Sequence, residues 1–227
     1  MKTIALLMTI NRRNLLKNGL ISTAALLTLP LNARAAEQCL AGSKTPAQAK
    51  GPFYPVVDQI DTNADLVLVN GATTVAKGKI VIVEGIVTDQ NCKPVPGTLV
   101  EIWQACESGR YDHPSDPNTA PLDPNFQYWG KAVTDNQGQY KFRTIIPGAY
   151  PADTNWVRPP HIHFKISRLG YIELITQMYF AGESLNAKDL ILQRLKKSDQ
   201  TKVIVDFKKI EQAQHPVGTF NIQIEKA

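Results

Sequence analysis

The stretch IVIVEGIV (residues 80–87) is β-branched and almost wholly apolar, as expected of a buried β-strand. Later segments share a β-branched or alternating pattern: 98–103 (TLVEIW), 161–167 (HIHFKIS), 174–180 (LITQMYF), 203–207 and 219–224. Pro- and Gly-bearing turns separate them. Many short strands with almost no helical periodicity predict an all-β fold, an antiparallel β-sandwich.

Three further segments refine this picture. Residues 133–145 alternate on either side of Asn-Gln-Gly (136–138), which predicts a hairpin. Residues 187–195 (AKDLILQRL) have helical periodicity after Asn186, a plausible N-cap, and predict one short helix. The loop at 107–129 is rich in Asp, Pro and Asn and is longer than a plain connection, so we expect it to serve an active site.

The N-terminus has the pattern of an export signal. Residues 1–35 contain five basic side chains and no acidic one, with an apolar run at 20–31 and the small-residue pattern ARA at 33–35. This order is typical of a secretory signal peptide, and the apolar run is too short to span a bilayer comfortably. The adjacent arginines of NRRNLLK (11–17) favour the twin-arginine route over an ordinary Sec signal. We expect one folded domain, residues 36–227, in the periplasm or outside the cell.

Removal of this signal changes the charge balance. The chain of 227 residues has 25 Lys and Arg against 20 Asp and Glu, a formal charge of +5 that would favour nucleic acid or an anionic membrane as partner. Without the five basic residues of the signal, the domain is formally neutral, so we expect no nucleic-acid binding and no membrane insertion. In an oxidising compartment one disulfide can form among Cys39, Cys92 and Cys106, and the sequence leaves the pairing open.

The most informative local motif is RPPHIHF (158–164). His161 and His163 are two residues apart on a predicted strand, so both imidazoles point to the same face and can reach one metal ion. Taken alone, a His-x-His pair is as often a pair of surface or core histidines as a metal site. No Asp or Glu lies within this strand, and Tyr111 and Tyr150, each in a turn-rich segment, are candidates for the missing ligands. A packing role is the alternative for either tyrosine.

Six segments in order along the chain carry a family resemblance: GPFYP (51–55), LVEIWQACESGRYDH (99–113), PLDPNF (121–126), TDNQGQYKFRTIIPGAYP (134–151), RPPHIHF (158–164) and LITQMYF (174–180). Together they resemble the intradiol ring-cleavage dioxygenases, in particular the protocatechuate 3,4-dioxygenase type and its exported relatives. The resemblance implies that residues 36–227 form a catalytic domain.

The resemblance also implies a mononuclear non-haem Fe(III) bound by Tyr111, Tyr150, His161 and His163. Two anionic phenolates favour ferric over ferrous iron, unlike the two-histidine-one-carboxylate set of Fe(II) oxygenases. In the family pattern Tyr150 is the axial ligand displaced by substrate, with His161 opposite, and Tyr111 and His163 lie in the equatorial plane. The displaced Tyr150 can take up a proton from the substrate, which makes it catalytic as well as a ligand.

Three further residues match family positions. Arg158 matches an arginine that stabilises negative charge developing on the substrate, and Gln177 matches a glutamine near the substrate; both are therefore predicted to be catalytic and substrate-binding. Tyr54 matches a residue of the substrate pocket, with packing an equal alternative. His113 could be a ligand on spacing alone, but the resemblance argues against it.

The implied function is an exported oxidoreductase of aromatic compound catabolism. It would take a small aromatic diol and O2, cleave the ring between the two hydroxylated carbons and give a muconate-type dicarboxylic acid. One alternative is a periplasmic β-sandwich module that binds a metal or an aromatic compound without cleaving it. Another is a Zn²⁺ hydrolase using His161 and His163, which lacks a nearby carboxylate. The sequence leaves the substrate and a homo-oligomeric state open.

Overall fold

Strand β1 (Ile80–Thr88) lies at the centre of one of two five-stranded sheets in the computed structural model, which describes residues 39–57, 59 and 61–227. The signal peptide predicted at 1–35 lies outside the described residues. The partners of this sheet are β4 (Gln139–Ile145), β10 (Phe207–Lys208), β11 (Val217–Thr219) and β12 (Ile222–Gln223). Strand β4 pairs with β1 in antiparallel fashion, whereas β11 and β12 both pair with it in parallel.

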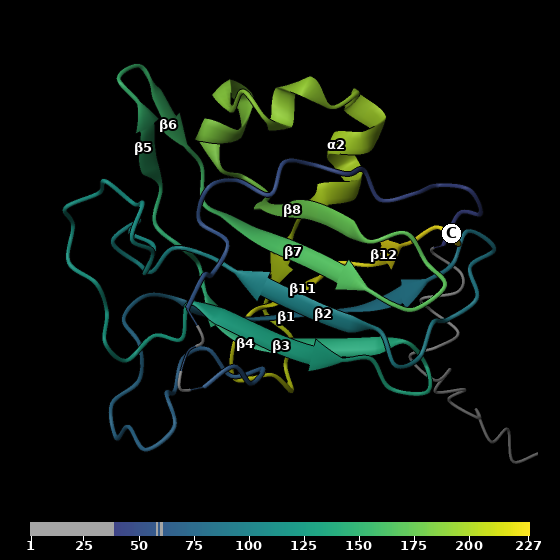
Figure 1. Cartoon of the computed structure of the whole chain (residues 1–227), viewed down its shortest axis with the longest axis horizontal. Coiled ribbons are helices and arrows are strands. Elements are labelled where there is room, and N and C mark those ends of the chain that lie inside the picture. Colours follow the sequence, from purple (N-terminus) through teal and green to yellow (C-terminus); the bar gives the residue numbers. More distant parts are fainter. Residues whose placement is uncertain (1–38, 58, 60) are drawn as a thin grey trace, which may run out of the picture.

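The second five-stranded sheet contains His161 and His163, and its strands are drawn in Figure 1. Its strands follow the order β3 (Trp129–Val133), β2 (Leu99–Trp103), β7 (His161–Ser167), β8 (Leu174–Phe180) and β9 (Ile204–Val205). The pairs from β3 to β8 are antiparallel, and β9 joins β8 in parallel. The prediction of an all-β sandwich is confirmed, with parallel pairings added by the short C-terminal strands.

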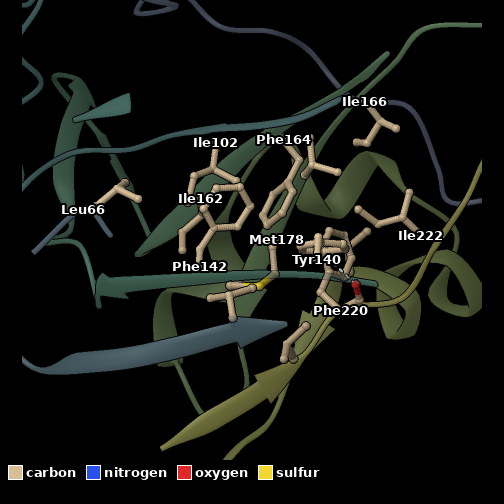
Figure 2. Packing of buried hydrophobic residues seen from close by; sticks show 14 of the residues in the cluster. Leu66, Ile102, Tyr140, Phe142, Ile162, Phe164, Ile166, Met178, Phe220 and Ile222 are labelled. Atoms are coloured by element: carbon tan, nitrogen blue, oxygen red, sulfur yellow. Dashed lines mark hydrogen bonds between the residues drawn. The ribbon is translucent and has the colours of Figure 1, made fainter. Parts of the chain in front are cut away.

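The space between the sheets is filled by apolar side chains from both of them (Figure 2). Ile162, Phe164 and Ile166 alternate along β7 and are buried against residues such as Phe142 of β4 and Met178 of β8. Since successive side chains of a strand point to opposite faces, the same alternation directs His161, His163 and Lys165 away from this core.

A small hairpin projects beyond the sheets (Figure 1). It consists of β5 (Tyr150–Asp153) and β6 (Trp156–Arg158), and Tyr150 lies directly opposite Arg158 in its register. The hairpin leads straight into β7 through Pro159 and Pro160. It therefore brings a tyrosine and an arginine to the edge of the face that carries the histidines.

The predicted hairpin over 133–145 is wrong. The turn itself forms, since the N–H of Gly138 donates to the carbonyl of Asp135 at 3.0 Å. The strands on its two sides, however, belong to different sheets: β3 pairs with β2, and β4 pairs with β1. Apolar and polar residues alternate in both flanking segments, but this pattern does not determine which strand each segment pairs with.

The predicted helix over 187–195 is also wrong. The segment forms two 3-10 turns, η2 (Ser184–Lys188) and η3 (Leu192–Arg194), and the one short α-helix of the described residues follows as α2 (Lys197–Val203). The carboxylate of Asp189 accepts the N–H of Leu192 at 2.7 Å, which favours a turn over a continuous helix. Asn186 does not act as a cap, because its amide donates to the carbonyl of Phe180.

Residues 44–54 form a segment without helix or strand, here called the N-terminal strap, that runs alongside β8 (Figure 1) and ends in a turn. The N–H of Gln48 donates to the carbonyl of Ile175 at 2.8 Å. Just before the strap, Cys39 forms a disulfide with Cys92, while Cys106 is a buried free thiol. The disulfide thus ties the start of the strap to the turn that follows β1. No helix in the described part of the chain could cross a membrane.

This pairing predicts the thiol content and its contribution to stability. Unfolded without reductant, the protein should show one reactive thiol, and three after reduction. The double variant Cys39→Ser/Cys92→Ser should lose about 2–4 kcal/mol of unfolding free energy, because the bond closes a long loop in the unfolded chain, over a separation of 53 residues. Thiol titration and urea unfolding measure both quantities. Three reactive thiols before reduction would contradict the pairing.

Candidate metal centre

Two cross-strand rows on the outer face of the second sheet place the candidate ligands. In the first row Trp103 of β2, His163 of β7 and Gln177 of β8 lie side by side, and in the second His161 lies opposite Tyr179. Each of these five residues is nearly or fully buried. The rows follow from strand register, so His161 and His163 share one face as the sequence predicts.

Tyr111, from the long loop, and Tyr150, from the β5–β6 hairpin, form a cluster of four rings with His161 and His163. Nε2 of His161 lies 3.2 Å from Nε2 of His163 and 3.4 Å from the hydroxyl of Tyr111. The ring of Tyr150 lies 5.5 Å from that of Tyr111, nearly perpendicular to it, and 5.7 Å from that of His161. The structure therefore brings all four predicted ligands together from three separate parts of the chain.

The hydrogen bonds of the two imidazoles fit a metal between them. Nδ1 of His161 lies 2.7 Å from the carbonyl oxygen of Pro159, to which it must donate, so Nε2 keeps its lone pair. That lone pair faces the Nε2 of His163. An imidazole that donates through one nitrogen and offers the lone pair of the other is the arrangement of a metal-binding histidine, and in this structure Nη1 of Arg158 lies 3.1 Å from that second nitrogen. Nδ1 of His163 has no hydrogen-bond partner among the described residues.

Burial keeps the ligands uncharged in the metal-free protein. It raises the pKa of Tyr111 well above its ordinary value, and the neighbouring Tyr150 raises it further. Burial also raises the pKa of Tyr150, against the opposing effect of the Arg158 guanidinium. The pKa values of His161 and His163 are lowered by burial and then by the positive charge of Arg158. Two phenols and two neutral imidazoles thus share a site in which a bound cation would favour the phenolates.

The donor set determines which metal fits. Among residues 39–57, 59 and 61–227, no group of three or more His, Cys, Asp or Glu side chains could hold a metal ion. The candidate set is instead two imidazoles and two phenols. Phenolate oxygens are hard anionic donors, and they suit a ferric ion.

Close backbone contact places Tyr111 in the cluster. Gly109 has φ +82°, and a Cβ added to it would lie 2.4 Å from the carbonyl oxygen of Ala149. The two motifs SGRY and PGAY can approach only because glycine stands at this point. Beyond it, the N–H of Tyr111 donates to the carboxylate of Asp116 at 2.7 Å. The loop thus fixes Tyr111 against the segment that leads to Tyr150.

Arg158 and Gln177 lie beside the cluster, as the sequence predicts. Nη1 of Arg158 lies 3.1 Å from Nε2 of His161, and Nη2 donates to Oε1 of Gln177 at 2.8 Å. The amide of Gln177 in turn donates to the carbonyl of Ala49 in the strap at 2.7 Å. The strap therefore sets the amide orientation that offers oxygen, not nitrogen, to Arg158.

The hydrogen bonds of Tyr54 and His113 go to groups outside the four-ring cluster. The hydroxyl of Tyr54 donates to Oε1 of Glu101 at 3.1 Å, and its ring packs edge-on against Trp103. Nδ1 of His113 accepts the N–H of Ser115 at 3.1 Å. The substrate-binding role of Tyr54 stays a prediction, and its hydroxyl is already engaged on the outer side of Trp103.

Several residues around the site were not singled out from the sequence. Trp103 stacks on His163 with ring centres 4.7 Å apart and planes 11° apart. Gly51 of the strap has φ +74°, and an added Cβ would lie 3.2 Å from Cε1 of His163. Tyr179 could have been found, because it is two residues from Gln177 on a predicted strand. Nothing in the sequence pattern marks Trp103 or Gly51 as neighbours of the histidine.

A hollow of about 590 Å³ lies beside the cluster. It is lined by residues 55–57, 59 and 61, by Val69, and by the segments 110–116 and 122–128. Of the four candidate ligands only Tyr111 lines it, and neither Arg158 nor Gln177 does. This hollow adjoins the metal centre on the side of the long loop.

Comparison with known proteins shows the family of the chain. The family model described as Dioxygenase matches residues 49–225. The chain belongs to the intradiol dioxygenase family. It is 46% identical over 133 residues to the protocatechuate 3,4-dioxygenase beta chain of Burkholderia cepacia (57% of each chain), and 31% identical over 174 residues to catechol 1,2-dioxygenase of Candida albicans (71% of this chain, 54% of the relative).

A solved structure extends the comparison to the fold of a whole domain. The dioxygenase domain of a dioxygenase–carbohydrate-binding protein fusion from Streptomyces sp. SirexAA-E superposes with a TM-score of 0.60 at 27% identity. The match covers 81% of this chain and 99% of that one. By contrast, the chain spans little more than half the length of the two curated relatives.

The centre predicts that iron binding depends on His163. His163→Ala should lower iron affinity by at least about 100-fold. Loss of a residue that only hydrogen-bonds to a ligand commonly costs less than this. His215→Ala is the matched control, because His215 belongs to neither the cluster nor its contacts, and it should keep the iron content of the wild type. Metal analysis after dialysis measures both. An iron content that His163→Ala leaves unchanged would remove this residue from the ligand set.

Proposed function

We propose that this chain is a non-haem ferric dioxygenase that cleaves a catechol-type ring between its two hydroxylated carbons. The observation that carries the proposal is the convergence of Tyr111, Tyr150, His161 and His163 in one buried cluster with Arg158 beside it. The names of the two curated relatives, one for protocatechuate and one for catechol, support an aromatic diol as substrate. The overall reaction adds both atoms of O2 to the ring and gives a dicarboxylic acid.

The four ligands would hold a mononuclear Fe(III). When bound, the ferric ion would take the two catechol oxygens as ligands and activate the ring toward O2. Tyr111 and Tyr150 would supply the two phenolates that favour the ferric state. All four ligands are less than a tenth exposed, so little of their own surface is open to water. Exclusion of water strengthens each electrostatic contact within the cluster.

Tyr150 and Arg158 have distinct tasks in this proposal. As a ligand Tyr150 would be a phenolate, and burial raises the pKa of its hydroxyl, so the phenolate oxygen of the displaced Tyr150 would take up one catechol proton and become the neutral phenol. Arg158 faces the cluster through Nη1, where a positive charge stabilises negative charge that develops on the substrate. Gln177 contacts Arg158 directly and lies in the same row as His163.

Export by the twin-arginine route is part of the same proposal. That route carries folded proteins, so iron could be bound before export. The disulfide between Cys39 and Cys92 supports an oxidising compartment such as the periplasm. A homo-oligomer is compatible with the proposal, and sedimentation of the purified protein measures it.

The colour of the purified protein tests the metal and its ligands. Phenolate-to-iron charge transfer should make the protein red-brown, and Tyr111→Phe or Tyr150→Phe should weaken or shift that absorption. Tyr150→Phe should also slow turnover while some iron stays bound. Tyr171→Phe is the matched control, since Tyr171 packs at the core and makes no contact with the cluster. A colourless protein that contains zinc would overturn the proposal.

Turnover separates an enzyme from a binding module. Catechol, protocatechuate and hydroxyquinol should be tested for O2 uptake with the iron-loaded protein, and at least one should consume one O2 per molecule and yield the diacid. This ratio is expected because both oxygen atoms enter the product. Binding of a catechol without O2 uptake for any of the three would favour the module.

A further inference from the structure

Asp189 is a buried carboxylate outside the proposed ligand set, and it binds the guanidinium of Arg158. Its side chain is 0% exposed and that of Arg158 is 3% exposed. Nε of Arg158 lies 3.0 Å from Oδ2 of Asp189, and Nη2 lies 3.3 Å from Oδ1. Two N–H groups of the planar guanidinium thus donate to the two carboxylate oxygens, which fixes the plane of the guanidinium.

The remaining contacts leave one edge of Arg158 for the metal centre. Nη2 also donates to Oε1 of Gln177 at 2.8 Å and to the hydroxyl of Tyr179 at 3.2 Å. With Nε and Nη2 engaged in this way, Nη1 is the nitrogen that faces the ligands, 3.1 Å from Nε2 of His161. The bidentate contact with Asp189 therefore determines which nitrogen of Arg158 is presented to the site.

Asp189 is itself held from a different part of the chain. Its Oδ1 accepts the N–H groups of Leu192 at 2.7 Å and Ile191 at 3.2 Å, between η2 and η3. These bonds orient the carboxylate toward Arg158 independently of the hairpin that carries the arginine. The rest of the network reaches the strap, because the hydroxyl of Tyr179 lies 3.1 Å from Oε1 of Gln48.

The pair also keeps a buried charge tolerable. Burial by itself would lower the pKa of Arg158, but the hydrogen bond and charge of Asp189, together with the nearby tyrosines, raise it above its ordinary value. Removing one partner of a buried ion pair leaves the other charge uncompensated, which is strongly unfavourable. Arg158 and Asp189 consequently behave as one unit.

We propose that Asp189 is a positioning residue for ring cleavage: it holds Arg158 so that Nη1 faces the metal-bound substrate. Asp189 touches none of the four ligands. Besides Arg158 it contacts the hydroxyl of Tyr179 at 3.5 Å, and its effect on the reaction is assigned to its bidentate contact with Arg158. This inference rests on the proposed function, since it concerns the same reaction. It assigns a catalytic consequence to the segment between η2 and η3, which the sequence predicts as an ordinary helix.

The variant Asp189→Asn separates positioning from local structure. It keeps the size of the side chain and one oxygen that can accept the N–H groups of Ile191 and Leu192, but it removes the charge and one acceptor for Arg158. In the iron-loaded protein we expect kcat per bound iron to fall about 10- to 100-fold. This is the usual range when a residue that supports a metal site from outside the ligand set is replaced. KM, iron content and the visible absorption should stay near those of the wild type, because the lost interaction matters in the transition state.

A double-mutant cycle tests whether the effect passes through Arg158. Arg158→Met should lower kcat at least as far as Asp189→Asn, and the double variant should be no slower than Arg158→Met alone. Asp65→Asn is the matched control, since Asp65 pairs with Arg143 at 3.0 Å far from the ligands, and it should keep the wild-type kcat. In urea unfolding, the double variant should be at least as stable as either single variant, because no unpaired charge remains.

Each possible outcome has a defined meaning. Wild-type kcat in Asp189→Asn, loss of its iron, or losses that multiply with Arg158→Met would each overturn the positioning role. If Asp189→Asn does not fold, Asp189→Glu replaces it: this variant keeps the charge but displaces it, so kcat should still fall, and an unchanged kcat would reject the role. Absence of O2 uptake by the wild type with every catechol would overturn the proposed function itself, and the role of Asp189 in turnover with it.

Discussion

The alternation along β7 is the constraint on which the rest of the structure depends. Ile162, Phe164 and Ile166 enter the core between the two sheets, and this forces His161 and His163 onto the opposite face. A shift of register by one residue would exchange the two sets, burying imidazoles in the core and exposing large apolar side chains. The free energy of packing the core therefore also holds the histidine pair in place, and the metal site gains its rigidity from the sandwich beneath it.

An outer sheet face that carries buried histidines has to be covered, and two segments from elsewhere in the chain do so. The N-terminal strap closes the face over β8 and His163, and a Cβ on Gly51 would lie 3.2 Å from Cε1 of His163. The β5–β6 hairpin closes its edge and brings Tyr150 opposite Arg158. The disulfide of Cys39 holds the start of the strap, so a covalent bond far from the ligands limits how the cover can move.

The sequence predicts the parts of this site that depend on local pattern. Strand alternation places His161 and His163 on one face, and the family motifs supply Tyr111 and Tyr150. What it does not predict are pairings that depend on the whole fold. The segment 133–145 alternates as a hairpin should, yet its halves join different sheets. The segment 187–195 has helical periodicity, yet Asp189 bonds to nearby N–H groups and to Arg158 instead. Tertiary contacts outweigh local preference at both places.

The same tertiary contact resolves an electrostatic difficulty of the site. A guanidinium that lies 3.1 Å from a metal-binding imidazole repels any cation held there, and in a buried site that repulsion is weakly screened. Asp189, bound to the far edge of the guanidinium, makes the pair formally neutral while leaving Nη1 directed at the ligands. An arginine with this partner can therefore stabilise negative charge on a substrate without excluding the cation on which the reaction depends. An arginine without this partner would keep its charge but would no longer be held with Nη1 directed at the ligands.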